Sequence, residues 1–140
     1  MAYDTNNVFA KILRGEIPSH KVFENDDVIA FMDVMPQGPG HTLVVPKAAS
    51  RNLLDADPAT LAKLLPVVQK IAVAVKEAFA ADGVSVFQYN EAAGGQSVFH
   101  LHIHVVPRHE GVPLGRHSDT MEDQAVLAAN AEKVRRALGA

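Results

Sequence analysis

The chain has 140 residues, of which 48% are hydrophobic and 21% are charged, and its formal net charge at pH 7 is −3. A chain of this length usually forms one domain with a hydrophobic core, and this composition is too apolar for an intrinsically disordered protein. The slight negative charge argues against long-range attraction to nucleic acid or to an anionic membrane, so any bound phosphate must be held locally.

Cysteine is absent, which excludes disulfides and thiolate metal sites. The polar N-terminal residues lack the cationic start and apolar centre of a secretory signal, and the apolar stretch 71–75 is far shorter than the ~20 residues that cross a bilayer. We therefore expect a cytoplasmic protein whose partners include neither nucleic acid nor a membrane. Because no repeat, linker or composition shift interrupts the chain, residues 1–140 are predicted to form one domain.

The first half of the chain predicts one helix and three strands. Apolar residues at helical spacing from Val8 onward predict a short helix that ends near Gly15. Short runs rich in Val, Ile and Phe predict a hairpin of two strands over residues 20–24 and 28–33. A third strand is predicted over residues 42–45, after a stretch that is broken by proline and glycine.

The second half predicts the longest helix, two strands and a last helix. Asp57 before a proline indicates the start of the long helix, which is expected to run to about Ala81. Pro66 lies inside it and predicts a kink or a later start, since a mid-helix proline costs ~3 kcal/mol. Strands are predicted over residues 84–89 and 98–106, and the last helix over residues 121–138. This order favours an α+β domain on an antiparallel sheet over repeated βαβ units.

A stretch that reads FHLHIHVVP places three of the seven histidines at every second position. Strand side chains alternate between faces, which predicts His100, His102 and His104 on one face. Solvent-facing histidines with ordinary hydrogen bonds are one interpretation of this pattern. A metal site is another, although same-face neighbours stand ~6.7 Å apart, so that only two of the three could share an ion, with His41 or His109 completing the shell.

Phosphoryl chemistry accounts for the regular spacing better than either alternative. An imidazole can attack phosphorus from its unprotonated nitrogen, and water can hydrolyse the resulting phosphoramidate. Flanking imidazoles can bind the negative charge without a metal, which makes the middle residue, His102, the expected nucleophile. Upstream, the backbone of residues 94–97 is expected to offer N–H groups as an anion-binding nest, with the Ser97 hydroxyl donating toward the phosphate or the leaving group.

Residues 100–106 (HLHIHVV) match the signature of the histidine triad (HIT) family, and the chain resembles that family over most of its length. Further matching segments are residues 11–18 (KILRGEIP), 22–26, 30–33, 36–37, 40–41, 43–47, 90 and 94–99. The resemblance is closest to the Hint and bacterial HIT branches. It implies a five-stranded antiparallel sheet with a long helix and shorter terminal helices, in a homodimeric enzyme that removes a substituent from the α-phosphate of a nucleotide through a nucleotidyl-histidine intermediate.

The resemblance also implies a role for each matching position. His102 would be the nucleophile, with His100 and His104 as phosphate and orientation partners. The other implied site residues are His41 beside the triad, Ser97 at the leaving group, Gly95, Gln96 and Asn90 at the phosphate, Asp33 at the ribose, and Phe9, Ile17, Phe31 and Val34 around the base. Without the resemblance, Asp33 could equally be a turn residue and the four apolar residues ordinary core.

Two departures from the family pattern matter. HIT proteins with structural zinc use a Cys-x-x-Cys near the start and a histidine after the Pro-Lys pair, and these places hold Asn7, Ala10 and Ala49 here. We therefore predict neither zinc nor another cofactor. The tail Val-Pro-Arg at residues 106–108 resembles the bacterial HIT and dinucleotide-hydrolase branches, which leaves the leaving group open.

The sequence therefore predicts a purine nucleoside phosphoramidase that acts on AMP or GMP derivatives without a metal. Diadenosine polyphosphates and adenylyl sulfate are the alternative substrates. A nucleotide-binding or interaction module with negligible turnover is the alternative outside enzymes, and a metal enzyme on a His-x-His pair is a third. A homodimer is predicted because a lone sheet has unprotected edges and the resemblance implies pairing through the long helix and an adjoining strand. The base, adenine or guanine, and the role of residues 121–140 stay open at this point.

Overall fold

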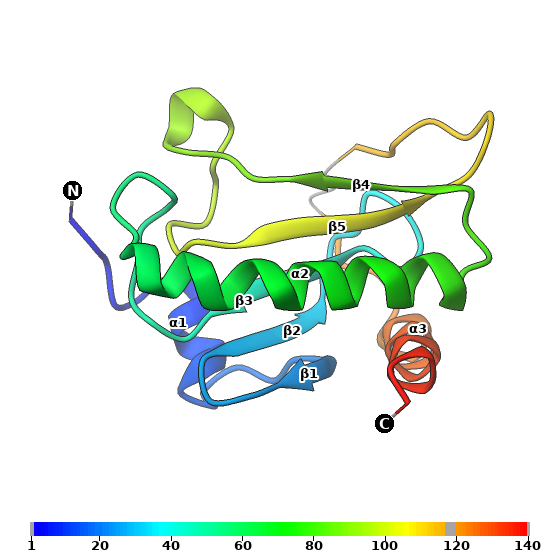
Figure 1. Cartoon of the computed structure of the whole chain (residues 1–140), viewed down its shortest axis with the longest axis horizontal. Coiled ribbons are helices and arrows are strands. Elements are labelled where there is room, and N and C mark those ends of the chain that lie inside the picture. Colours follow the sequence, from blue (N-terminus) through cyan, green and yellow to red (C-terminus); the bar gives the residue numbers. More distant parts are fainter. Residues whose placement is uncertain (1, 117–119, 140) are drawn as a thin grey trace.

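The computed structural model describes residues 2–116 and 120–139, so residues 1, 117–119 and 140 of the predicted single domain lie outside the described part. The helices and strands follow one another in the predicted order, with one short 3₁₀ turn added (Figure 1). They are α1 (Val8–Leu13), β1 (Lys21–Glu24), β2 (Val28–Met32), β3 (Thr42–Pro46), α2 (Pro58–Ala78), β4 (Gly83–Phe87), η1 (Ala92–Gly94), β5 (Ile103–Arg108) and α3 (Gln124–Ala137).

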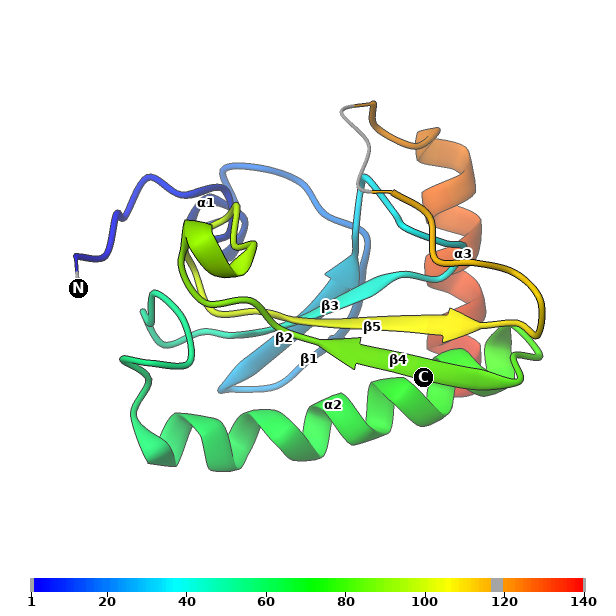
Figure 2. The same cartoon turned by 90° about the horizontal axis from the view of Figure 1, so that it is seen from above.

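The five strands form one antiparallel sheet in the order β1-β2-β3-β5-β4. The predicted α+β class and sheet type are confirmed. Figure 2 shows α2 along one face of this sheet and α1 with η1 on the other. The last helix, α3, packs against α2, β1 and β2.

Alternation of side chains along the strands divides the core in two. One cluster joins the sheet to α2 and α3 through residues such as Ala30, Val44 and Ile71. The second lies on the face of α1 and contains Phe9, Ile29, Phe31, Leu43 and Val45. Because fully burying an aliphatic or aromatic side chain stabilises by about 1.5–3 kcal/mol, both clusters hold their helices on the sheet.

Helix α2 begins where the sequence predicts and runs without interruption through its proline. The side chain of Asp57 accepts a hydrogen bond from the backbone N–H of Ala59, and Pro58 is the first helical residue. The later start suggested by Pro66 is therefore wrong. Both Pro66 and Ala62, whose carbonyl loses its helical donor, are exposed, so water can bond to that carbonyl. The helix ends at Ala78, before Ala80 adopts a positive φ of 47°.

By length and composition alone, α2 is apolar enough to cross a membrane. Its buried face instead packs on the sheet through Leu64, Val67, Val68, Ile71, Ala74 and Val75. A core helix of a globular domain passes the same compositional test.

The histidine segment departs from the prediction, because β5 begins at Ile103 and not at residue 98. The N–H of Leu101 donates to the carbonyl of Ser50 at 2.8 Å, outside the ladder that β3 and β5 share from Ile103 onward. His100 and His102 therefore precede the strand. All three histidines are buried, with exposed fractions of 0%, 8% and 6% for His100, His102 and His104, so the solvent-facing interpretation is wrong.

Other boundaries differ from the prediction by a few residues. The helix α1 ends at Leu13, and Gly15 turns the chain with a positive φ of 78°. Strand β4 ends at Phe87. The last helix begins at Gln124 and not at residue 121, because Asp123 caps it by accepting a hydrogen bond from the N–H of Ala125.

Candidate functional site

A cavity of about 630 Å³ lies on the α1 face of the sheet. Eight of the residues implied by the family resemblance line it, namely Phe9, Ile17, Phe31, Asp33, Val34, Ser97, His102 and His104. The sheet register explains part of this grouping, because Phe31 pairs with Leu43 and Leu43 pairs with His104 across three neighbouring strands. The walls are mostly apolar, and the histidines with Ser97 and Asp33 supply polar groups, as is usual for a small-molecule site.

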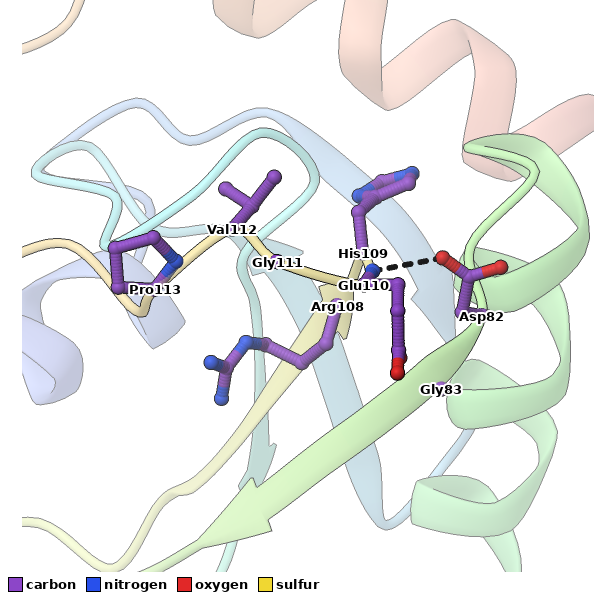
Figure 3. Close-up of a pocket in the computed structure, with 8 residues that line it drawn as sticks. All are labelled: Asp82, Gly83, Arg108, His109, Glu110, Gly111, Val112 and Pro113. Atoms are coloured by element: carbon purple, nitrogen blue, oxygen red, sulfur yellow. Dashed lines mark hydrogen bonds between the residues drawn. The ribbon is translucent and has the colours of Figure 1, made fainter.

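A second cavity of about 540 Å³ lies at the opposite end of β5 (Figure 3). It is lined by Asp82, Gly83 and residues 108–113. Two of its polar residues are bonded to each other, since the N–H of Glu110 donates to Asp82, and Arg108 donates to Ser85, which lies outside the lining. Among the described residues that line it, none belongs to the row His100, His102 and His104, so the chemistry of that row belongs to the first cavity.

His102 presents an unprotonated nitrogen. Its Nδ1 lies 2.7 Å from the carbonyl oxygen of His100, which can only accept, so Nδ1 carries the hydrogen and Nε2 carries the lone pair. Burial lowers the pKa of His102 to about 4, although the bond to His100 acts in the opposite direction. The ring meets the ring of Phe9 edge to face at a centroid distance of 4.8 Å. His102 is therefore a fixed, neutral imidazole at pH 7.

His104 carries its hydrogen on the opposite nitrogen. The backbone N–H of Gln37 donates to His41 Nδ1 at 3.0 Å, so the hydrogen of a neutral His41 is on Nε2. This Nε2 donates to His104 Nδ1 at 2.9 Å, which leaves the hydrogen of His104 on its own Nε2. The ring of His104 also stacks on Phe87 at 4.6 Å. Two neighbouring rings thus offer a lone pair and an N–H group, respectively.

His100 acts through its backbone and does not line the cavity. Its Nε2 donates to the carbonyl of Pro46 at 2.8 Å, and its Nδ1 accepts a hydrogen bond from the hydroxyl of Tyr3. Burial lowers the pKa of His100, against the effect of the Pro46 carbonyl. These bonds fix the segment whose carbonyl holds His102.

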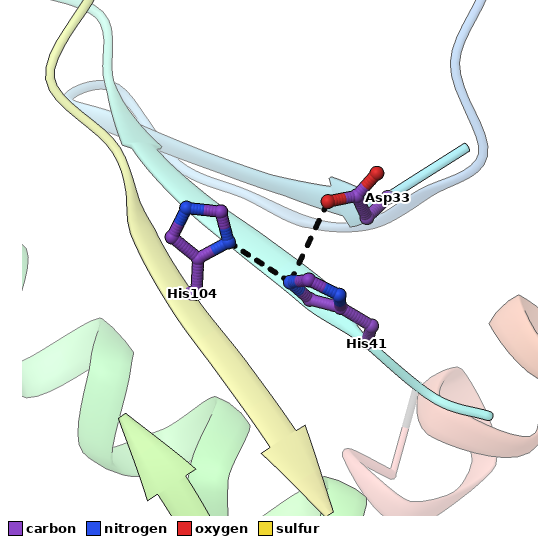
Figure 4. Close-up of side chains that lie close together, drawn as sticks. All are labelled: Asp33, His41 and His104. Atoms are coloured by element: carbon purple, nitrogen blue, oxygen red, sulfur yellow. Dashed lines mark hydrogen bonds and ion pairs between the residues drawn. The ribbon is translucent and has the colours of Figure 1, made fainter. Parts of the chain in front are cut away.

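Asp33, His41 and His104 place ligand-type atoms within 4.8 Å of one another (Figure 4). The residues do not fit a metal ion in this arrangement, because the Gln37 N–H occupies the lone pair of His41 Nδ1 and Nε2 then carries a hydrogen. Oxygen Oδ2 of Asp33 lies 3.5 Å from that Nε2, and Oδ1 accepts from the N–H of Met35. Hydrogen bonds therefore run from Gln37 through His41 to His104, and the Asp33 carboxylate lies beside His41. His109, the other suggested ligand, bonds instead to the carbonyl of Phe79.

The glycine loop differs from the expected anion-binding nest. The N–H groups of Gly94, Gly95 and Gln96 donate to the carbonyls of Glu91 and Ala92, so these three amides do not face a phosphate. The buried side chain of Gln96 is used within the protein as well, because its Oε1 accepts from Asn52 and the N–H of Glu91, and its Nε2 donates to the carbonyls of Arg51 and Val98.

Asn90 is engaged in the same loop, where its Oδ1 accepts from the N–H of Leu53 at 3.0 Å. Arg51 clamps Glu91 with two hydrogen bonds of 2.8 and 3.0 Å, at a position where Glu91 has a positive φ of 65°. This clamp was not predicted from the sequence. The clamp fixes the loop that positions Ser97 at the cavity.

Sequence reasoning also missed one wall of the cavity, formed by Ser19, His20, Met121 and Gln124. His20 Nε2 lies 2.8 Å from Gln124 Oε1 and donates to it across 104 positions of the chain. Periodicity and short motifs carry no signal for a contact between such distant segments. The only hint was the apolar and helical pattern that begins at residue 121.

A model of the HIT domain matches residues 14–111. A Hit-like protein involved in cell-cycle regulation from Bartonella henselae has a crystal structure with an unknown ligand. Its sequence is 58% identical to this chain, and the match covers 98% of this chain and 99% of that one. The two structures superimpose with a TM-score of 0.94. A zinc-bound histidine triad family protein from Mycobacterium smegmatis is 34% identical over 96% of this chain and 94% of that one, with a TM-score of 0.85. Adenylylsulfatase HINT3 of Arabidopsis thaliana is 36% identical, and the match covers 84% of this chain and 63% of that protein.

Proposed function

This chain belongs to the HIT domain family, a family of nucleotide hydrolases and nucleotide-binding proteins, and from that premise we propose that it cleaves the substituent from the α-phosphate of a purine nucleotide. The first candidate substrates are phosphoramidates of AMP or GMP. One observation carries the proposal, namely the bond from His102 Nδ1 to the His100 carbonyl, which leaves a neutral ring with its Nε2 lone pair at the cavity that Ser97 and His104 also line.

The reaction proceeds in two displacements. Nε2 of His102 forms a bond to phosphorus while the bond from phosphorus to the amine breaks, and the amine takes a proton from the Ser97 hydroxyl or a neighbouring imidazole. The Nδ1 bond to the His100 carbonyl stabilises the positive charge that the His102 ring acquires. Water then attacks phosphorus and returns a proton to the group that protonated the amine, while the bond from phosphorus to Nε2 breaks, which releases the nucleoside monophosphate and restores the neutral imidazole.

His104 and Asp33 complete the proposed substrate site. The N–H of His104, set by the hydrogen bond from His41, donates to a phosphoryl oxygen. Asp33 accepts from the ribose hydroxyls, and Phe9, Ile17, Phe31 and Val34 enclose the base. Gly95, Gln96 and Asn90 hold the loop, because they form hydrogen bonds with other groups of the protein.

The direct test replaces His102. We expect His102→Ala to lose at least about a thousandfold in kcat/KM toward an adenosine phosphoramidate assayed with a chelator, because no other unprotonated nitrogen stands in its place. His109→Ala is the matched control, since His109 bonds to the carbonyl of Phe79 outside the cavity, and it keeps wild-type turnover. Unchanged turnover in His102→Ala would refute the assignment. If AMP binds to the wild type while no substrate is consumed over hours, the chain is a binding module.

Adenylyl sulfate is the second candidate substrate, because a relative that is 36% identical is an adenylylsulfatase. Sulfate leaves as a weakly basic anion, whereas an amine needs a proton. We therefore expect Ser97→Ala to slow phosphoramidate cleavage by about tenfold to a hundredfold and to spare cleavage of adenylyl sulfate. Assays of both substrates and of a diadenosine polyphosphate, on the wild type and this variant, measure the difference. Equal loss on all three would show that Ser97 serves the phosphate and not the leaving group.

We also propose that residues 1–140 form one domain that acts in the cytoplasm as a homodimer. The packing of α3 on α2 and β1 supports the single domain. The position of β4 at an edge of the sheet, with Val86 exposed, supports pairing through this strand and α2.

A further inference from the structure

The segment before α1 lies outside the residues that match the HIT domain, which begin at residue 14. Hydrogen bonds nevertheless hold it to the rest of the protein. The guanidinium of Arg51 donates to the carbonyl of Ala2 at 3.1 Å. The side chain of Asn7 donates to the carbonyl of Asp4 at 2.8 Å and also caps α1. Tyr3 lies between these two points, so its position in the structure is fixed from both sides.

Tyr3 contacts the first histidine of the row. Its ring meets the ring of His100 edge to face at a centroid distance of 5.6 Å, and its hydroxyl donates to His100 Nδ1. His100 is fully buried, and its Nε2 donates to the carbonyl of Pro46 at 2.8 Å. Nδ1 therefore holds a buried lone pair, and the Tyr3 hydroxyl is the donor that satisfies it.

The same His100 residue connects Tyr3 to His102 through its backbone. The carbonyl of His100 accepts from His102 Nδ1 at 2.7 Å, at a point before β5 begins to pair with its neighbours at Ile103. The peptide group that contains this carbonyl is held on one side by the bond from the Leu101 N–H to a carbonyl of the next segment, and on the other by the His100 ring. Loosening of the ring therefore moves the carbonyl that orients His102.

We propose that Tyr3 is a positioning residue for His102 and acts through His100. The proposal rests on the proposed function, since it assumes that His102 is the nucleophile. Tyr3 does not line the cavity, so it leaves the contacts with the substrate unchanged. Without its hydroxyl, the buried Nδ1 of His100 loses its donor, which is unfavourable enough to displace the ring. His102 then loses the fixed direction of its Nδ1 hydrogen and of its Nε2 lone pair.

Tyr3→Phe tests this role, because it keeps the aromatic ring and removes the hydroxyl. We expect kcat toward an adenosine phosphoramidate to fall about tenfold while KM stays constant, since the attacking atom is misplaced and the cavity lining is intact. Nuclear magnetic resonance of the His102 ring nitrogens shows which of them carries the hydrogen. The hydrogen is expected on Nδ1 in the wild type and shared between the two nitrogens in Tyr3→Phe.

Asp57→Ala is the control for a loss of stability alone. It removes the cap of α2, which lies on the opposite face of the sheet from α1, and Asp57 is outside the cavity lining. This variant is expected to unfold at a lower urea concentration than the wild type and to keep the wild-type kcat and His102 tautomer.

Unchanged kcat in a folded Tyr3→Phe, a change in KM alone, or a fall in kcat that leaves the His102 tautomer unchanged would overturn the proposal. The same holds if Asp57→Ala lowers kcat equally. The tautomer needs no turnover, so the two proposals fail separately. Turnover that depends on His102 but not on Tyr3 refutes only the role of Tyr3. A tautomer that shifts as expected in a protein without turnover refutes only the hydrolase.

Discussion

At the scale of single residues, His102 and His104 differ chemically because their Nδ1 atoms form hydrogen bonds with different kinds of group. A carbonyl accepts from Nδ1 of His102, and the N–H of His41 donates to Nδ1 of His104. The first ring therefore keeps a lone pair at Nε2 and the second keeps an N–H. Identical side chains two positions apart thus provide the nucleophile and the phosphate donor of the proposed reaction.

The low pKa of His102 predicts a loss of stability in acid. In the unfolded chain its pKa is near 6.5, whereas burial lowers it to about 4 in the folded protein, so between these values only the unfolded state binds the proton. Stability therefore falls as the pH drops from about 6.5 to about 4, by up to about 3 kcal/mol from this group. His100, whose pKa burial also lowers, acts in the same direction.

Urea denaturation between pH 7 and pH 4.5 measures this effect. His102→Gln lacks the titrating ring and is expected to show a shallower decline of the free energy of unfolding than the wild type. If the free energy of unfolding falls equally steeply in both proteins, burial of neutral His102 is not a cause of the loss of stability in acid.

At the scale of elements, α2 shows how a helix accommodates a proline. Pro66 lies on the exposed face between the buried positions Leu64 and Val67, so the lost hydrogen bond concerns a carbonyl that water can reach. The packing of six buried side chains keeps both halves of the helix on the sheet. Tertiary burial here outweighs the local preference of proline to end a helix.

Pro66→Ala is accordingly expected to stabilise the protein. The restored N–H can donate to the carbonyl of Ala62, and we expect the free energy of unfolding to rise by about 1–2 kcal/mol. This is less than the ~3 kcal/mol cost of a buried mid-helix proline, because the unfolded chain also gains entropy when the proline is removed. Urea denaturation measures the change. Pro113→Ala, in a loop, serves as the control and is expected to give no gain. A loss of stability in Pro66→Ala would mean that the proline ring packs against another surface.

At the scale of the whole molecule, exposed apolar residues support the proposed homodimer. Leu65 and Val73 on α2 are 63% and 64% exposed, and Val86 on the edge strand β4 is 49% exposed. An edge strand has unpaired backbone N–H and C=O groups, so a second copy can pair with it and cover its exposed apolar side chain.

We expect light scattering at micromolar concentration to give about twice the chain mass of 15.0 kDa. Val86→Lys is expected to raise the dissociation constant at least about tenfold, because it places a charge in the contact. Val126→Lys, on the exposed side of α3, is the control and leaves the mass unchanged. A stable monomer of the wild type would contradict the homodimer.

Local patterns in the sequence predict the order of the helices and strands and name His102 as the proposed nucleophile. Spacing of apolar residues, the Asp57 cap and the alternating histidines act over a few residues, and a helix or strand forms largely from such neighbours. The same reasoning places Ser97 and Asp33 near the histidines through the family motif. It does not reveal where β5 begins, since that depends on Leu101 bonding to Ser50.

Only the tertiary structure decided which hydrogen bonds connect the site residues and which residues form the cavity walls. The hydrogen of His104 is placed by His41, which is 63 positions away, and one wall of the cavity is closed by Gln124, which meets His20 across 104 positions. The inward bonding of Gln96 likewise depends on Asn52 and Arg51. Tautomers, pKa values and cavity walls depend on burial and on partners that chain folding brings together, and periodicity along the sequence contains no information about those partners.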